Sequence, residues 1–189
     1  MVDVKEMLNK LLMVARDDRA SIPYSHEEGF VPKLIFIGPN DEVSVSPALW
    51  SNEADKYALM ERAAEGARRT FAQAIVLVSD TRWIESDVFC EHFKINPTTD
   101  DGHFDLTKYQ EQYLAILRQH GGQMKNLPRQ LWREAISVAM KGPRCGTHCV
   151  MAPYIQGPGD KVQYIPKPSK LGEDDANKYE MRLIPEWWV

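Results

Sequence analysis

The feature that most constrains the fold of this chain is an uninterrupted apolar run, Ala74–Val78, which the polar segment Ser79–Arg82 follows directly. A short run of this kind, rich in β-branched residues and without polar alternation, is typical of a strand buried on both faces of a sheet. We therefore expect this segment to be the central strand, and we interpret the other segments by their relation to it.

Segments with strand character lie on both sides of the central run. Residues 33–38 and 43–46 flank the turn formers Pro39–Glu42, and a second pair of segments flanks Gly157–Asp160, so each pair predicts a β-hairpin. A last strand is expected at about 179–184. The strands expected in the central sheet are 33–38, 43–46, 74–78, 149–155 and 161–166.

Two segments, 3–16 and 52–72, carry apolar residues at helical spacing and predict amphipathic helices. Each has one apolar face, so both are expected to pack on the sheet. The predicted fold class is α/β (α+β), a central mixed β-sheet with flanking helices and a helical insertion.

The insertion is expected at about 84–144. Asp105 suits the N-cap of a helix from Leu106 to about His120, and Pro128 suits the first turn of another helix that ends near Met140. The 189 residues are expected to form a single domain, 1–189, which contains this insertion.

Composition narrows the class of partner and the compartment. The net charge of −4 argues against a general nucleic-acid or anionic-membrane binder. Three unevenly spaced cysteines are no disulfide framework and favour a reducing compartment. The first residues lack the pattern of a signal peptide, and no window approaches the ~20 apolar residues of a membrane span. We expect a cytoplasmic protein without a membrane partner.

Part of the chain resembles a known layout. The residues Phe36–Val43, a helix, and then Val76–Trp83 are similar to a pattern in small bacterial and phage-encoded α/β proteins of unknown function. The resemblance covers residues 33–83. It implies an α/β fold and a bacterial or phage-encoded protein, and it brings no catalytic residues to carry over.

Cysteine and histidine residues gather in two short segments, Cys90–His92 and Cys145–Cys149. Zinc prefers four thiolate or imidazole ligands in tetrahedral geometry. Cys90, His92 and Cys145, with His148 or Cys149, would supply such a set. The alternative is that the thiols are ordinary core residues, because free cysteine behaves as a small hydrophobe.

A second candidate site follows the central strand. Ligands of open α/β sheets bind beyond the carboxyl ends of the strands. Asp80 is expected there as a base or cation ligand, and Arg82 as a partner for a carboxylate or phosphate. The alternative is that Ser79 and Asp80 only cap a turn.

Two further features point to a binding partner. Between residues 118 and 144, six basic side chains accompany the single acid Glu134, and Arg129 and Arg133 would share a helix face. Trp187 and Trp188 precede the last residue, and two large apolar side chains are unfavourable in water. Tryptophan is common both in cores and in interface hot spots. The expected partner-binding residues are Arg118, Lys125, Arg129, Arg133, Trp187 and Trp188.

Together these features favour a non-enzymatic binding protein that contacts a protein partner or forms a homo-oligomer. Nucleic acid at residues 118–144 is the less favoured partner, and no cofactor is expected. The alternative is a metal-dependent hydrolase, with zinc, whose site lies near Asp80 or at the Cys90, His92, Cys145, His148 and Cys149 set.

Overall fold

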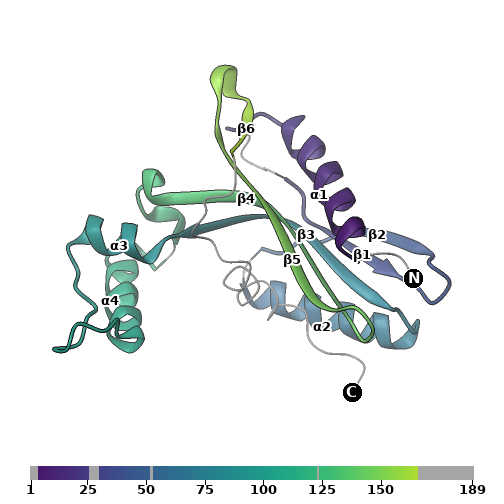
Figure 1. Cartoon of the computed structure of the whole chain (residues 1–189), viewed down its shortest axis with the longest axis horizontal. Helices are drawn as coiled ribbons and strands as arrows, with labels where there is room; N and C mark the ends of the chain where they lie inside the picture. The colour runs from purple at the N-terminus through teal and green to yellow at the C-terminus, as the bar shows by residue number, and fades with distance from the viewer. Residues whose placement is uncertain (1–3, 26–29, 52, 123, 166–189) are drawn as a thin grey trace. The chain divides into compact units, whose positions relative to one another are not determined.

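The computed structural model describes residues 4–25, 30–51, 53–122 and 124–165 (Figure 1). The predicted strand at 179–184 and the tryptophans Trp187 and Trp188 lie outside these ranges. The helices are α1 (Val4–Ala20), α2 (Glu53–Arg69), α3 (Ser86–Phe93) and α4 (Leu106–Gln119). The strands are β1 (Lys33–Ile37), β2 (Val43–Pro47), β3 (Ala74–Ile84), β4 (Trp132–Gly142), β5 (Gly146–Gln156) and β6 (Val162–Tyr164). Short 3₁₀ turns occupy η1 (Met124–Asn126), η2 (Arg129–Leu131) and η3 (Pro158–Asp160).

The chain divides into two compact units. The first contains the described residues up to Thr81 and from Glu134 onward, and the second is Arg82–Arg133. The first unit contains α1, α2 and most of the sheet. None of the described helices is long and apolar enough to cross a membrane.

The strands form one six-stranded sheet in the order β2-β1-β3-β4-β5-β6, and the α+β class is confirmed. Both predicted hairpins are present, since β1 pairs with β2 and β5 with β6. The sheet is antiparallel where a mixed one was expected. The reason is that β2 and β3, which α2 connects, do not lie side by side: β1 lies between them and runs antiparallel to both.

The first half of β3, Ala74–Val78, is buried on both faces, as its sequence predicts. Val76 and Val78 join an apolar cluster with Leu8 of α1. Ile75 and Leu77 point to the other face and pack in a cluster with Met60 and three alanines of α2. The alternation of side chains along a strand therefore divides one apolar run between two cores.

The predicted helix from Pro128 to Met140 is wrong, because the segment forms η2 and then most of β4. Ala135, Ile136, Val138 and Ala139 are fully buried in this strand. Burial on both faces removes the alternation that identifies a half-exposed strand, and the remaining apolar spacing imitates a helix. Tertiary packing in the sheet overrides the helix propensity of these residues.

The second unit has a small core of its own. Phe89 of α3 is fully buried. Its ring centroid lies 4.8 Å from that of Tyr113 and 4.7 Å from that of Phe93. Helix α4 confirms the prediction at Leu106–His120, and the side chain of Asp105 accepts a hydrogen bond from the Lys108 amide as an N-cap. Helix α3 was not predicted from the sequence.

Gly142 is expected to be essential for packing at the end of β4, whereas Gly66 in α2 is not. A Cβ at Gly142 would lie 2.1 Å from the carbonyl oxygen of Gln73, and backbone cannot move away cheaply. Gly142→Ala should lower the free energy of unfolding by about 2 kcal/mol through overpacking.

The matched control is Gly66→Ala, because a Cβ at Gly66 meets nothing within 4 Å. This change should raise the free energy of unfolding by about 0.5–1 kcal/mol, the usual gain in a helix interior. Urea denaturation of both variants measures the difference. Equal stability of the two variants would contradict the close approach of β4 to Gln73.

Candidate functional site

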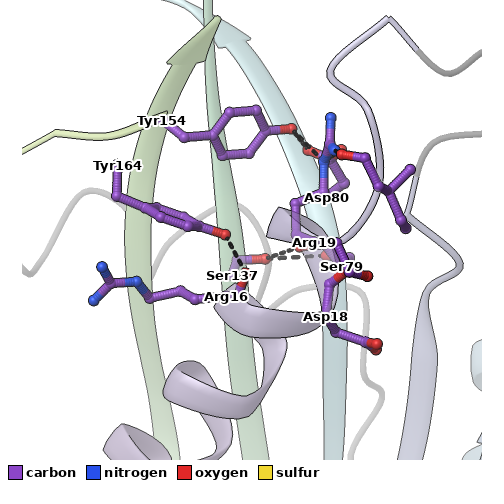
Figure 2. Close-up of polar contacts among 10 residues, drawn as sticks. Arg16, Asp18, Arg19, Ser79, Asp80, Ser137, Tyr154 and Tyr164 are labelled. Carbon is purple, nitrogen blue, oxygen red and sulfur yellow. Dashed lines mark hydrogen bonds and ion pairs between the residues drawn. The ribbon is translucent and has the colours of Figure 1, made fainter. Parts of the chain in front are cut away.

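Asp80 does not lie beyond the end of a strand, because β3 continues to Ile84. This corrects the predicted position of the Asp80 and Arg82 site. Asp80 lies on the α1 side of the sheet, and its side chain is only 10% exposed. Figure 2 shows the hydroxyl of Tyr154, from β5, pointing at this carboxylate, to which it donates a 2.6 Å hydrogen bond.

Arg19, from the last turn of α1, completes the cluster. It is 1% exposed, and its Nε lies 3.4 Å from Oδ2 of Asp80 and 3.4 Å from the Tyr154 hydroxyl. The guanidinium also donates to the carbonyl of Ile22 at 3.1 Å and lies 5.1 Å above the Tyr154 ring. A charge buried to this degree is tolerated only with hydrogen-bonded partners of opposite charge.

The electrostatics of the cluster keep Arg19 charged and Tyr154 neutral. Burial alone would lower the pKa of Arg19, but Tyr154, Asp80 and the buried Glu134 outweigh it and raise that pKa. Burial and the adjacent Asp80 carboxylate raise the pKa of Tyr154. Arg19 and Asp80 therefore form an ion pair, and the neutral Tyr154 hydroxyl donates a hydrogen bond to Asp80. Together the three residues hold α1 against β3 and β5.

A second tyrosine extends this cluster along the same side of the sheet. Tyr164 of β6 lies opposite Tyr154 in the β5–β6 ladder, and their ring centroids are 5.9 Å apart. Its hydroxyl donates to the carbonyl of Arg16 at 2.9 Å, and burial raises its pKa to about 12. The Arg16 guanidinium lies 4.4 Å above the ring.

Arg19, Tyr154, Tyr164 and Glu134 were not predicted as site residues from the sequence. One signal was present, because Arg19 continues the helical spacing of Leu8 and Ala15, both of which are buried. A basic residue in line with a buried stripe indicates a buried ion pair. The tyrosines gave no such signal, because only the strand pairing places them beside α1.

The other face of the sheet carries a row of hydroxyls. The Oγ of Ser137 lies 3.0 Å from the hydroxyl of Ser79 and 2.8 Å from that of Thr81 (Figure 2 shows the two serines). Ser137 is fully buried and Ser79 nearly so. A serine nucleophile needs a general base in hydrogen-bond reach, and the side chain of Ser137 contacts two hydroxyls and the backbone carbonyl of Ser79. The row therefore holds β3 to β4.

The proposed zinc ligands are divided between the two units. Cys90 and His92 lie on α3, whereas Cys145 lies in the turn before β5, and His148 and Cys149 lie near the start of β5. His148 and Cys149 are neighbours in a strand, so their side chains point to opposite faces. In the described ranges, no group of three or more His, Cys, Asp or Glu side chains is placed to hold a metal ion. The geometry gives the zinc hypothesis no support.

The thiols are also poorly suited to be nucleophiles. Burial raises the pKa of Cys145, which packs against the α1 core, and burial together with Asp87 raises the pKa of Cys90. A reactive cysteine requires the opposite shift. The ring of His148 contacts the backbone oxygen of Cys145 at 2.6 Å.

The basic residues do not form the expected helical stripe. Arg129 belongs to η2 and Arg133 to β4, so they share no helix face. Arg133 approaches Oε2 of Glu85 at 3.5 Å, and Arg82 lies 5.5 Å above the ring of Trp132. Arg118 and Arg129 are exposed, and Lys125 lies in η1.

A surface cavity of about 260 Å³ lies near the start of α2. Its lining residues are Leu49, Trp50, Ser51, Asp55, Ala58 and Arg62. The carboxylate of Asp55 accepts a hydrogen bond from the Ser51 amide at 3.3 Å, and the ammonium of Lys56 lies 5.3 Å from the Trp50 ring. These polar contacts connect the first turn of α2 to the segment that precedes it.

The strand β2 is an exposed feature of the first unit. It is the terminal strand of the sheet, and all five of its residues are exposed. Val43 and Val45 are each 61% exposed, and the strand contains no charged residue. We call this strand, Val43–Pro47, the β2 edge.

Comparison with protein-family models, with curated proteins and with solved structures found no match to this chain. The functional inference therefore depends on the geometry.

Tyr154→Phe should lower the free energy of unfolding by about 1–3 kcal/mol. The change removes the donor to Asp80 and one acceptor of Arg19, and leaves two buried charged groups less satisfied. Chemical denaturation measures it. Tyr57→Phe on the exposed surface of α2 is the control and should leave stability unchanged; an equal loss in both variants would contradict a role for the Tyr154 hydroxyl.

Alkaline pH should weaken the fold through Tyr154 and Tyr164. Unfolded tyrosine ionises near pH ~10, whereas Tyr164 in the folded chain has a pKa of about 12 and that of Tyr154 is also raised. The unfolded state therefore releases protons first, and the free energy of unfolding should fall from about pH 10 to about pH 12. Denaturation at several pH values tests this. Tyr164→Phe should make the fall shallower, and an unchanged slope would refute it.

Proposed function

We propose that this chain is a non-enzymatic binding protein, and that it binds a protein partner by strand addition at the β2 edge. The observation that carries the proposal is an edge strand whose five residues are all exposed and uncharged. Strand addition uses the main-chain hydrogen bonds of an open edge for affinity and alternate side chains for specificity.

The polar residues of the first unit favour binding over catalysis. Asp80, the best candidate base, is held between the Tyr154 hydroxyl and the Arg19 guanidinium. Ser137 contacts other hydroxyls, and the pKa of Cys145 is raised. General acid–base and nucleophilic catalysis both need an accessible group with a pKa adjusted to the reaction. Asp80 and Ser137 are largely buried and hydrogen-bonded, and the pKa of Cys145 is shifted in the wrong direction.

Among the described residues, the β2 edge has few of the features that protect sheet edges. Proteins usually prevent edge pairing with short strands, prolines, lysines, inward-facing charges, bulges or a covering segment. Here the sequence alternates Val-Ser-Val-Ser, and the register with β1 is regular from Lys33↔Pro47 to Ile37↔Val43. Pro47 ends the strand and limits the partner to a short segment.

Capture of partners from cells that produce the protein tests this function. The double variant Val43→Lys/Val45→Lys places two charges on the open edge and should reduce the captured partner at least about tenfold, as a charged edge disfavours pairing. Leu114→Lys, at an exposed position of α4, adds the same type of charge elsewhere and should have no effect.

Hydrogen exchange gives a second measurement on the same complex. The amides of Val43 and Val45 should exchange more slowly when the partner is bound, because strand addition protects outward-facing N–H groups. The proposal fails if the double lysine variant captures as much partner as the Leu114→Lys control.

A further inference from the structure

We infer that the partner of the β2 edge is β2 of a second copy of this chain, paired antiparallel about a two-fold axis at Ser44. This inference rests on the proposed function, since it uses the same edge. The partner and the register both follow from the backbone of the β1–β2 hairpin.

The hairpin determines which backbone groups face outward. The amide of Gly38 donates to the carbonyl of Glu42, and the amide of Ala48 donates to that of Pro32. Hydrogen-bonded and non-hydrogen-bonded pairs alternate along an antiparallel ladder. Between these two ends, Ser44 and Ser46 therefore bond to β1, while the N–H and C=O groups of Val43 and Val45 face the open edge.

Only a register centred on Ser44 satisfies all of these outward groups in a symmetric pair. Val43 then pairs with Val45 of the partner subunit, and Val45 with Val43 of the partner subunit, each through an N–H and a C=O. A register centred on Val45 would place Val43 opposite the partner's Pro47, which has no N–H to donate. A register centred on Val43 would engage Asp41, whose φ of 61° is not extended.

The side chains agree with this register. Val43 and Val45 pair with Ile37 and Ile35 in the ladder and share their face of the sheet, the side on which α1 packs. The valines of two copies would then form one continuous apolar patch, and aliphatic β-branched pairs stabilise neighbouring strands. Glu42 would face the partner's Ser46, so no acidic residue meets its own copy.

Helix α1 carries an exposed apolar residue on the side that faces β1. Asp18 of α1 forms an ion pair with Lys33 of β1, so this side of the helix faces the hairpin. Val14 lies one turn earlier on that side and is 67% exposed. An isologous interface, in which the same patch serves both subunits, needs this kind of self-complementary surface.

Sedimentation velocity of the full chain over a range of concentrations tests the inference. Val45→Pro removes an outward N–H and leaves the bonds of Ser44 and Ser46 to β1 in place, so it should weaken dimerisation about tenfold or more. Val45→Thr keeps the N–H and should dimerise close to wild type. Circular dichroism confirms that both variants fold.

Cysteine crosslinking tests the register. Ser44→Cys places two thiols directly opposite each other in a non-hydrogen-bonded pair, where Cβ atoms lie about 4.5–5.5 Å apart, and should give a disulfide-linked dimer on oxidation. Ser46→Cys places them roughly 13 Å apart and should not. Mass spectrometry of the linked peptides separates this bond from bonds of Cys90, Cys145 or Cys149.

Three results would overturn the inference: a monomer at every concentration, a dimer that Val45→Pro leaves intact, or linkage through Ser46→Cys in preference to Ser44→Cys. If the chain is a monomer but the Val43→Lys/Val45→Lys variant still fails to capture a different protein, the second copy is excluded as the partner. The proposed function then stands. If the chain is a monomer and the lysine variant captures partners as well as the wild type does, both the inference and the proposed function are excluded.

Discussion

A buried charge is the constraint on which the first unit depends. Arg19 is almost completely inaccessible, so its guanidinium requires an oppositely charged partner and a further hydrogen-bond partner, which β3 and β5 supply. Asp80 comes from β3 and Tyr154 from β5, while Arg19 itself ends α1. Because an unpaired buried charge is strongly unfavourable, this cluster restricts where α1 can lie on the sheet.

The buried polar groups of the first unit are hydrogen-bonded or ion-paired with one another, which explains why the candidate site lies at an edge and not in the core. The buried polar side chains of the first unit are used to hold α1, β3, β4 and β5 together. The backbone of β2 differs, because its outward N–H and C=O groups have no neighbouring strand among the described elements. Main-chain pairing is the chemistry that such an edge offers.

Much of the fold was predictable from local pattern. Ala74–Val78 is a strand buried on both faces, the two hairpins form, and the helices near 3–16, 52–72 and 106–120 are present. These elements carry their own signals, either periodicity or turn residues. The segment Trp132–Gly142 carries no such signal, because burial on both faces gives it an apolar spacing that a helix shares.

The sequence by itself therefore determined the α+β class, the central strand and the alternating, uncharged character of Val43–Ser46. Only the tertiary structure decided that Asp80 is paired, that the cysteine and histidine residues are divided between two units, and that β2 is a terminal strand. The physical reason is range: periodicity and turn chemistry act between near neighbours. Ion pairing and strand order join residues that are far apart along the chain.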